Sequence, residues 1–251
     1  MNIVILAAGY ATRLYPQTLK TAKPLLDVAG KPMMEWVIDS LAPISGVEQV
    51  FVVTNDKFAA DFDTWAAAYN RSHAKVPFTI VNDGTKNETD RLGAIGDIHY
   101  VIQKHGIGGE DLIVVAADNL FSESLADFGK FAREKNTPVL GVYDVGSLDE
   151  AKEYGVVAVD AAGVISQFVE KPENPPSTHI GIALYYYPKH IVPMIAEYIA
   201  TGENHDQPGR LIQWLYPKTP VHTWSVPGTW FDIGSKENLA EANRAFAKFV
   251  K

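Results

Sequence analysis

The chain has 251 residues with 22 Lys or Arg and 30 Asp or Glu, so its formal charge is −8 with neutral histidines. This acidic balance disfavours nucleic acid and anionic membranes as partners, because both attract a net or localised positive field. With 47% apolar and 21% charged residues, the composition is that of a globular protein with a sizeable core. The absence of cysteine excludes disulfides, thiolate metal sites and cysteine nucleophiles.

The apolar start of the chain has no cationic leader, and no apolar run reaches the ~18 residues of a membrane span. We therefore expect a soluble, cytoplasmic protein without a nucleic-acid or membrane partner.

In the first half of the chain, short β-branched runs alternate with amphipathic stretches, which is typical of βαβ units around a parallel sheet. We predict nearly continuously apolar strands, buried on both faces, at residues 2–8, 49–54, 76–81 and 111–116. We predict helices at residues 32–44, 57–69 and 92–104.

The second half is less regular. We predict strands at residues 137–143, 155–159, 164–169, 179–187 and 220–226. Residues 160–163 carry a hairpin signal between two of them. We predict helices at residues 189–200 and 209–216, and from residue 236 to the C-terminus. The simplest organisation is one domain, 1–251, with a compact second lobe after about residue 137.

The connection after the first strand is much longer than the ~2–6 residues of an ordinary βα loop. Gly9 lets backbone amides approach an anion, and Thr12 adds a hydroxyl. Residues 1–32 carry a net charge of +3, with the cations Arg13, Lys20, Lys23 and Lys31. Because open α/β sheets bind ligands at the carboxyl ends of their strands, this loop is predicted to bind an anion.

Two aspartates are candidate metal ligands. Asp118 follows the fourth predicted strand, where an aspartate also commonly serves as a helix cap or turn residue. Together with Asp232 it can supply the hard oxygen ligands that Mg²⁺ prefers.

Six short motifs follow one another along nearly the whole chain. They are L-A-A-G-Y-A-T-R-L-Y-P-Q-T (6–18), A-K-P-L (22–25), G-K-P (30–32), A-D-N (117–119), V-E-K-P (169–172) and W-F-D-I-G-S (230–235). In order and spacing they resemble the nucleotidyltransferases that make nucleotide sugars from sugar 1-phosphates. The resemblance implies the α/β nucleotide-diphospho-sugar transferase fold, a Rossmann-like, mostly parallel mixed sheet flanked by helices. It also implies a nucleotide-binding half, 1–136, and a sugar-phosphate-binding half, 137–251.

The resemblance assigns roles to particular residues. Asp118 and Asp232 are implied to hold the catalytic Mg²⁺. Arg13 is implied to clamp the β- and γ-phosphates of a nucleoside triphosphate, and Lys23 to contact the α-phosphate.

On the acceptor side, Lys171 is implied to hold the phosphate of the sugar 1-phosphate and Glu170 a sugar hydroxyl. We expect substrate contacts from Ala8, Gly9, Thr12, Asn82, Gly84, Asn119, Glu170, Lys171 and His179.

The chain departs from the family pattern in places. Ala11 stands where the family usually has glycine, so a left-handed turn there would be strained. Ala22 and Ala117 replace a proline and a glycine. The base-reading segment also differs, at residues 81–85 and 91–94, which leaves the nucleobase open.

The expected reaction is transfer of a nucleotidyl group, from dTTP or UTP by preference, to a sugar 1-phosphate with release of pyrophosphate. Alternatives are a cytidylyltransferase for phosphocholine or another phosphorylated alcohol, and a non-catalytic nucleotide-sugar sensor. A nicotinamide-dependent Rossmann enzyme is disfavoured because residues 9–14 do not supply G-x-G-x-x-G. We expect a monomer or homodimer.

Overall fold

The computed structural model describes residues 1–73 and 78–249, and the chain divides into two compact units. Unit 1 consists of Met1, Gly93–Val114 and Phe128–Val226, and unit 2 of Asn2–Leu92, Val115–Asp127 and Pro227–Lys251. The two units interleave along the sequence, because the chain passes twice from unit 2 into unit 1 and back. The nucleotide-binding and sugar-phosphate-binding halves, 1–136 and 137–251, stay a prediction. That the whole chain acts as one nucleotidyltransferase domain stays a prediction.

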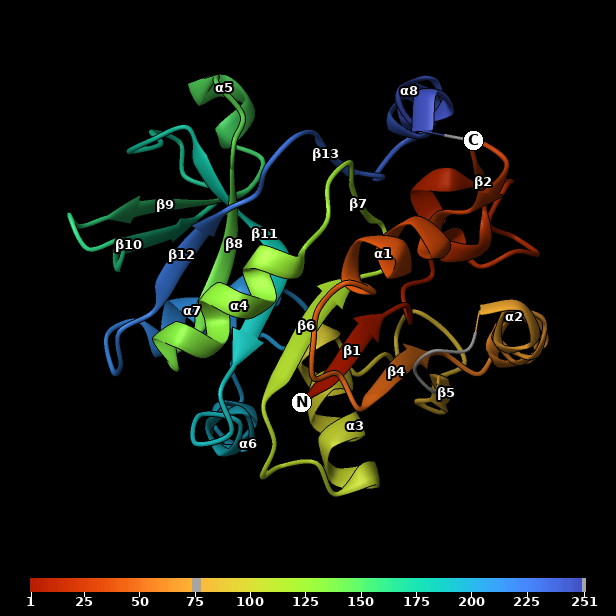
Figure 1. Cartoon of the computed structure of the whole chain (residues 1–251), viewed down its shortest axis with the longest axis horizontal. Coiled ribbons are helices and arrows are strands. Elements are labelled where there is room, and N and C mark those ends of the chain that lie inside the picture. The colour runs from red at the N-terminus through yellow and green to blue at the C-terminus, as the bar shows by residue number, and fades with distance from the viewer. Residues whose placement is uncertain (74–77, 250–251) are drawn as a thin grey trace. The chain divides into compact units, whose positions relative to one another are not determined.

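A parallel sheet lies at the centre of unit 2. Its strands are β1 (Asn2–Leu6), β4 (Gln49–Thr54) and β5 (Phe78–Asn82), which lie side by side in Figure 1. All three were predicted, and residues 76–77 of the third predicted strand lie outside the described residues. Almost every residue of β1 and β4 is buried, as expected for strands covered on both faces.

Unit 2 also holds three helices and several short elements. They are the 3₁₀ turns η1 (Thr12–Leu14), η2 (Lys23–Leu25) and η3 (Ala247–Phe249), the hairpin of β2 (Asp27–Val28) and β3 (Lys31–Pro32), and helices α1 (Met33–Leu41), α2 (Ala59–His73) and α8 (Lys236–Phe246). Helix α1 ends earlier than predicted because Pro43 follows, and a proline has no amide hydrogen to continue the helical hydrogen bonds. Ser235 caps α8, its hydroxyl accepting from the Asn238 amide.

A two-stranded antiparallel ladder of β7 (Asn119–Phe121) and β13 (Trp230–Asp232) completes unit 2. Strands this short carry no visible periodicity, and they were missed in the sequence. The ladder joins segments more than 100 residues apart, with Asp232 paired to Asn119. Strand β6 (Leu112–Ala116) leads from unit 1 into unit 2 just before this ladder.

Unit 1 contains helices and a mixed arrangement of strands. Its elements are α3 (Ala94–His105), β8 (Val139–Asp144), α5 (Leu148–Ala151), β9 (Gly155–Val159), β10 (Ile165–Glu170), β11 (His179–Tyr187), α6 (Pro193–Ala200), α7 (Gly209–Leu215) and β12 (His222–Ser225). Strands β9 and β10 form the predicted hairpin, β11 pairs antiparallel with β8 and β9, and β12 pairs parallel with β8. The predicted α/β class with a mixed sheet is confirmed.

Two helix predictions need correction. Helix α4 (Ala126–Lys135), which enters unit 1 at Phe128, was missed because Gly129 interrupts its helical propensity, although Phe128, Gly129 and Ala132 give it one buried face. The helix predicted from residue 189 begins at Pro193, which is favourable in the first helical turn. In the described part of the chain, no helix has the length and apolarity needed to span a membrane.

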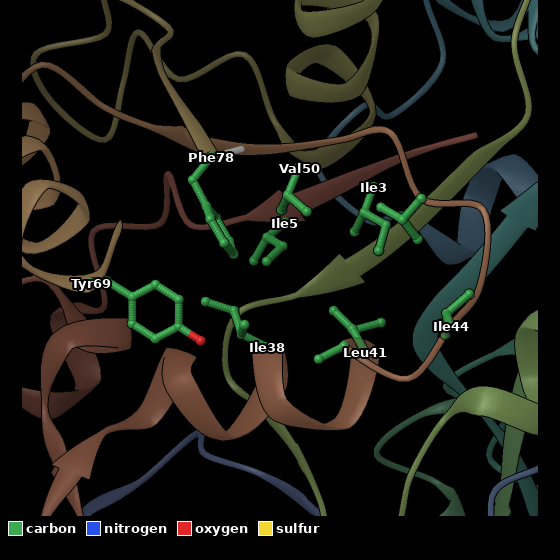
Figure 2. A pocket seen from close by; sticks show the side chains of 10 residues that line it. Ile3, Ile5, Ile38, Leu41, Ile44, Val50, Tyr69 and Phe78 are labelled. Atoms are coloured by element: carbon green, nitrogen blue, oxygen red, sulfur yellow. The ribbon is translucent and has the colours of Figure 1, made fainter. Parts of the chain in front are cut away.

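An apolar cavity of about 80 Å³ lies in unit 2 between the sheet and α1 (Figure 2). Ile3, Val50 and Phe78 form one row across the three strands, and Ile38 and Leu41 of α1 face them.

Val50→Ile is expected to stabilise unit 2 by about 0.5–1 kcal/mol, because the added methyl group fills part of the cavity. Val52→Ile on the same strand is the matched control, since Val52 is fully buried and does not line the cavity. The control should lose about 1–3 kcal/mol through overpacking. Urea unfolding measures the free energy of unfolding of both variants. Equal losses of stability in the two would show that Val50→Ile does not fill a cavity.

Candidate active site

The long loop after β1 is fixed to the neighbouring strand. The Ala7 amide donates to the Val53 carbonyl at 2.9 Å, and the fully buried Asn55 donates its side-chain amide to the Ala8 carbonyl at 2.8 Å. The following Gly9 is exposed. The loop therefore begins on a rigid support with its glycine accessible to a ligand.

Ala11 adopts the left-handed conformation, with φ 49° and ψ 45°. Its carbonyl accepts from the Thr18 hydroxyl at 2.7 Å and from the Leu14 amide at 3.1 Å. These bonds stabilise the left-handed conformation, which is ~1–2 kcal/mol less favourable for a residue other than glycine. The strain expected from alanine at this position is thus present, and the turn leads into η1, where Thr12 and Arg13 are exposed.

Lys23 and Asp118 form an ion pair. The ammonium of Lys23, on η2, donates to Asp118 Oδ2 at 2.5 Å, and the two side chains are 14% and 27% exposed. The Ala117 amide donates to the Leu6 carbonyl, so Asp118 lies at the carboxyl end of β1, as predicted. Burial opposes ionisation of Asp118, but the charge and hydrogen bond of Lys23 outweigh it and lower the pKa of this carboxyl.

Asp232 lies beside Asp118. Its strand β13 pairs with β7, and the Ile233 amide donates to the Asp118 carbonyl at 3.1 Å. Burial and the negative charge of Asp118 raise the pKa of Asp232 to about 6, although Lys23 and Arg13 oppose this. The structure thus brings Lys23, Asp118 and Asp232 together, and the exposed Arg13 acts on Asp232 through its charge.

The donor set fits Mg²⁺. Two adjacent carboxylates offer hard oxygen ligands, and their mutual repulsion favours a cation between them. Among the residues that the structure describes, no group of three or more acidic or histidine side chains is placed to hold a metal ion. Two carboxylates with further ligands from substrate phosphate are the usual arrangement for Mg²⁺.

Asn119 is deeply buried, and both ends of its amide have protein partners. Its Nδ2 donates to Asp118 Oδ1 at 3.0 Å, and its Oδ1 accepts from the Trp230 indole at 2.8 Å. The sequence suggested a substrate contact for this residue. In the structure Asn119 joins Asp118 to Trp230, and its predicted substrate contact stays a prediction.

The loop after β5 holds the other two predicted nucleotide contacts. Asn82 donates to Asp56 at 2.8 Å and accepts from the Gly84 amide, so it shapes the turn in which Gly84 takes a φ of 82°. The buried Asp83 accepts twice from Thr85 through Oδ1. Its buried Oδ2 has no hydrogen-bond partner among the described residues.

The predicted acceptor residues belong to unit 1. Lys171 is exposed at the end of β10 and has a left-handed φ of 46°, held by a 3.0 Å bond from its amide to the Tyr154 carbonyl. Backbone strain of this kind clusters at functional sites. His179 is exposed at the start of β11.

Glu170 is half-buried next to two glycines. A Cβ at Gly155 or Gly209 would lie 3.0 or 3.3 Å from Glu170 Oε2. Burial raises the pKa of Glu170, against the positive charges of Arg210 and Lys171. Arg210, on α7, is oriented by a 3.0 Å bond to Gln207. Arg210 is not among the site residues predicted from the sequence.

Comparison with known proteins identifies the class. The family described as nucleotidyl transferase matches residues 2–248, and the chain belongs to this family. A solved structure of UDP-glucose pyrophosphorylase complexed with UDP-glucose has the same fold, with a TM-score of 0.82, 23% identity and 99% coverage of both chains.

Two curated relatives are similar over most of the chain. One is the UTP–glucose-1-phosphate uridylyltransferase AglF of Haloferax volcanii, 29% identical over 74% of this chain and 72% of its own length. The other is the bifunctional protein GlmU of Methanocaldococcus jannaschii, 25% identical over 97% of this chain. The chain spans only 54% of that longer relative.

Ala11→Gly is expected to stabilise the protein by about 0.5–1 kcal/mol, because relief of left-handed strain exceeds the entropy that glycine adds to the unfolded chain. Ala67→Gly, at an exposed position within α2, is the matched control and should lose about 1 kcal/mol. Denaturant unfolding measures the free energy of unfolding of both variants. Similar losses in both would show that Ala11 is not strained.

Proposed function

We propose that the protein transfers a nucleotidyl group from a nucleoside triphosphate, dTTP or UTP by preference, to a sugar 1-phosphate. The observation that carries this proposal is the grouping of Lys23, Asp118 and Asp232 at the carboxyl end of β1, beside a loop with accessible cations. This grouping combines positive charge for phosphates with two carboxylates for a metal ion.

In this reaction a phosphate oxygen of the acceptor attacks the α-phosphorus of the triphosphate. The bond from that phosphorus to the bridging oxygen breaks, and pyrophosphate leaves with the electron pair. The attacking oxygen is already ionised at neutral pH, so no protein nucleophile or strong general base is required.

Each residue group has one task. Arg13, Thr12 and the backbone around Ala8 and Gly9 bind the leaving β- and γ-phosphates, while Lys23 stabilises charge on the α-phosphate. Asp118 and Asp232 would hold Mg²⁺, which neutralises phosphate charge when bound.

Residues of unit 1 would hold the acceptor. Lys171 offers an exposed ammonium for its phosphate, and Glu170 a carboxylate for a sugar hydroxyl. The positive charge of Arg210 lowers the pKa of Glu170, so Arg210 adds a second cation near this carboxylate. His179 is the further acceptor contact in this assignment.

One observation favours a second candidate, cytidylyl transfer to a phosphorylated alcohol. The half-buried Asn82 and the exposed Gly84 lie in the loop expected to read the base. The amide oxygen of an asparagine accepts from an amino group, which cytosine offers and uracil and thymine lack at the same ring position.

Pyrophosphate release should be measured with dTTP, UTP, CTP, GTP and ATP, each crossed with sugar 1-phosphates and phosphorylated alcohols. We expect release with dTTP or UTP and a hexose 1-phosphate. Release with CTP alone would replace this assignment by the second candidate. Binding of nucleotide sugars without any release would identify a sensor.

Lys23→Met is expected to lower kcat by about 10²–10³, because it removes charge stabilisation from the transition state. Lys20→Met is the matched control, since Lys20 is an exposed lysine of the same loop and should change kcat less than about threefold. Steady-state kinetics with the best substrate pair measures both. Equal effects in the two variants would remove Lys23 from the proposed mechanism.

A further inference from the structure

A chain of three hydrogen bonds runs through the centre of unit 2. The Trp230 indole donates to Asn119 Oδ1, Asn119 Nδ2 donates to Asp118 Oδ1, and Lys23 donates to Asp118 Oδ2. Trp230 lies on β13, Asn119 lies on β7 and Asp118 directly precedes β7. Each oxygen of the Asp118 carboxylate has its own donor.

The β7–β13 ladder explains why these groups meet. Trp230 and Asp232 are two residues apart on β13, so their side chains lie on the same face of the strand. Asn119 pairs directly with Asp232 across the ladder. A diagonal neighbour on the same face is within reach of an aromatic side chain, so the indole of Trp230 meets the amide of Asn119.

The indole also decides which way the Asn119 amide points. An indole has a donor and no acceptor, so it can bond only the oxygen of the amide. With that oxygen held, the NH₂ group faces the aspartate. Asn119 is 4% and Trp230 9% exposed, so water has little access to compete for these bonds.

We infer that Trp230 and Asn119 are positioning residues that orient the Asp118 carboxylate for a divalent cation. This inference rests on the proposed function, in which Asp118 is a metal ligand. Partners that orient a ligating carboxylate are worth about 10–100-fold in metal affinity. The indole hydrogen bond of Trp230 reaches Asp118 through Asn119, so its effect on the carboxylate depends on Asn119.

The experiment measures Mn²⁺ binding to the full-length protein from the electron paramagnetic resonance signal of unbound Mn²⁺. Trp230→Phe keeps the ring and removes the N–H, and we expect the Mn²⁺ dissociation constant to rise about tenfold. Asn119→Ala should raise it at least as much. Because the pathway is shared, the double variant should bind Mn²⁺ no more weakly than Asn119→Ala alone.

Trp65→Phe is the matched control. It also loses one indole hydrogen bond, at 2.9 Å to Glu35, in the same unit. Its Mn²⁺ affinity should equal that of the wild type. Melting temperatures identify any general loss of structure, and equal weakening by Trp65→Phe and Trp230→Phe would overturn the inference.

Asp118→Asn separates failure of this inference from failure of the proposed function. If Asp118→Asn weakens Mn²⁺ binding and Trp230→Phe leaves it unchanged, the positioning role is overturned and the proposed reaction stands. The positioning role is also overturned if the losses of Mn²⁺ affinity in Trp230→Phe and Asn119→Ala add up in the double variant. If Asp118→Asn leaves Mn²⁺ affinity unchanged, both the positioning role and the metal assignment are wrong.

Discussion

Unit 2 is organised around two carboxylates that stand side by side in a largely buried setting. Asp118 and Asp232 repel each other, and burial makes the charge of each harder to maintain. Lys23 stabilises the charge of Asp118 directly, while Asp232 remains the more easily protonated of the two. A cation placed between them would relieve this repulsion, and the proposed metal site rests on that electrostatic argument.

The position of these carboxylates depends on backbone contacts between distant segments. A three-residue ladder and one bond from Ile233 to the Asp118 carbonyl hold the second aspartate against the first. Lys23 reaches them from a single 3₁₀ turn. Small shifts in any of these supports would change the distance between like charges, which explains why short, irregular elements here are buried and hydrogen-bonded.

Two segments that match family motifs are held in left-handed conformations. Ala11 and Lys171 both have positive φ, and in each case a backbone group of that residue forms a hydrogen bond with a neighbouring segment. The replacement of glycine by alanine at position 11 has therefore not removed the turn. Tertiary hydrogen bonds compensate for a local preference that the side chain opposes.

The α/β class, the parallel strands of unit 2 and the family could all be predicted from the amino-acid sequence alone. Residues 49–54 form a strand as predicted. Their β-branched and aromatic side chains are typical of a parallel strand that is buried on both faces of its sheet. The motif spacing also selected Lys23, Asp118 and Asp232, which the fold brings together.

The support of the aspartates follows from the tertiary structure, since strands of three residues carry no periodic signal and pair across more than 100 residues. Tertiary contacts also hold Trp230 and Asn119 against Asp118, place the charge of Arg210 near Glu170 and divide the chain into two interleaved units. These features depend on contacts between distant segments, and such contacts are set by packing of the whole chain.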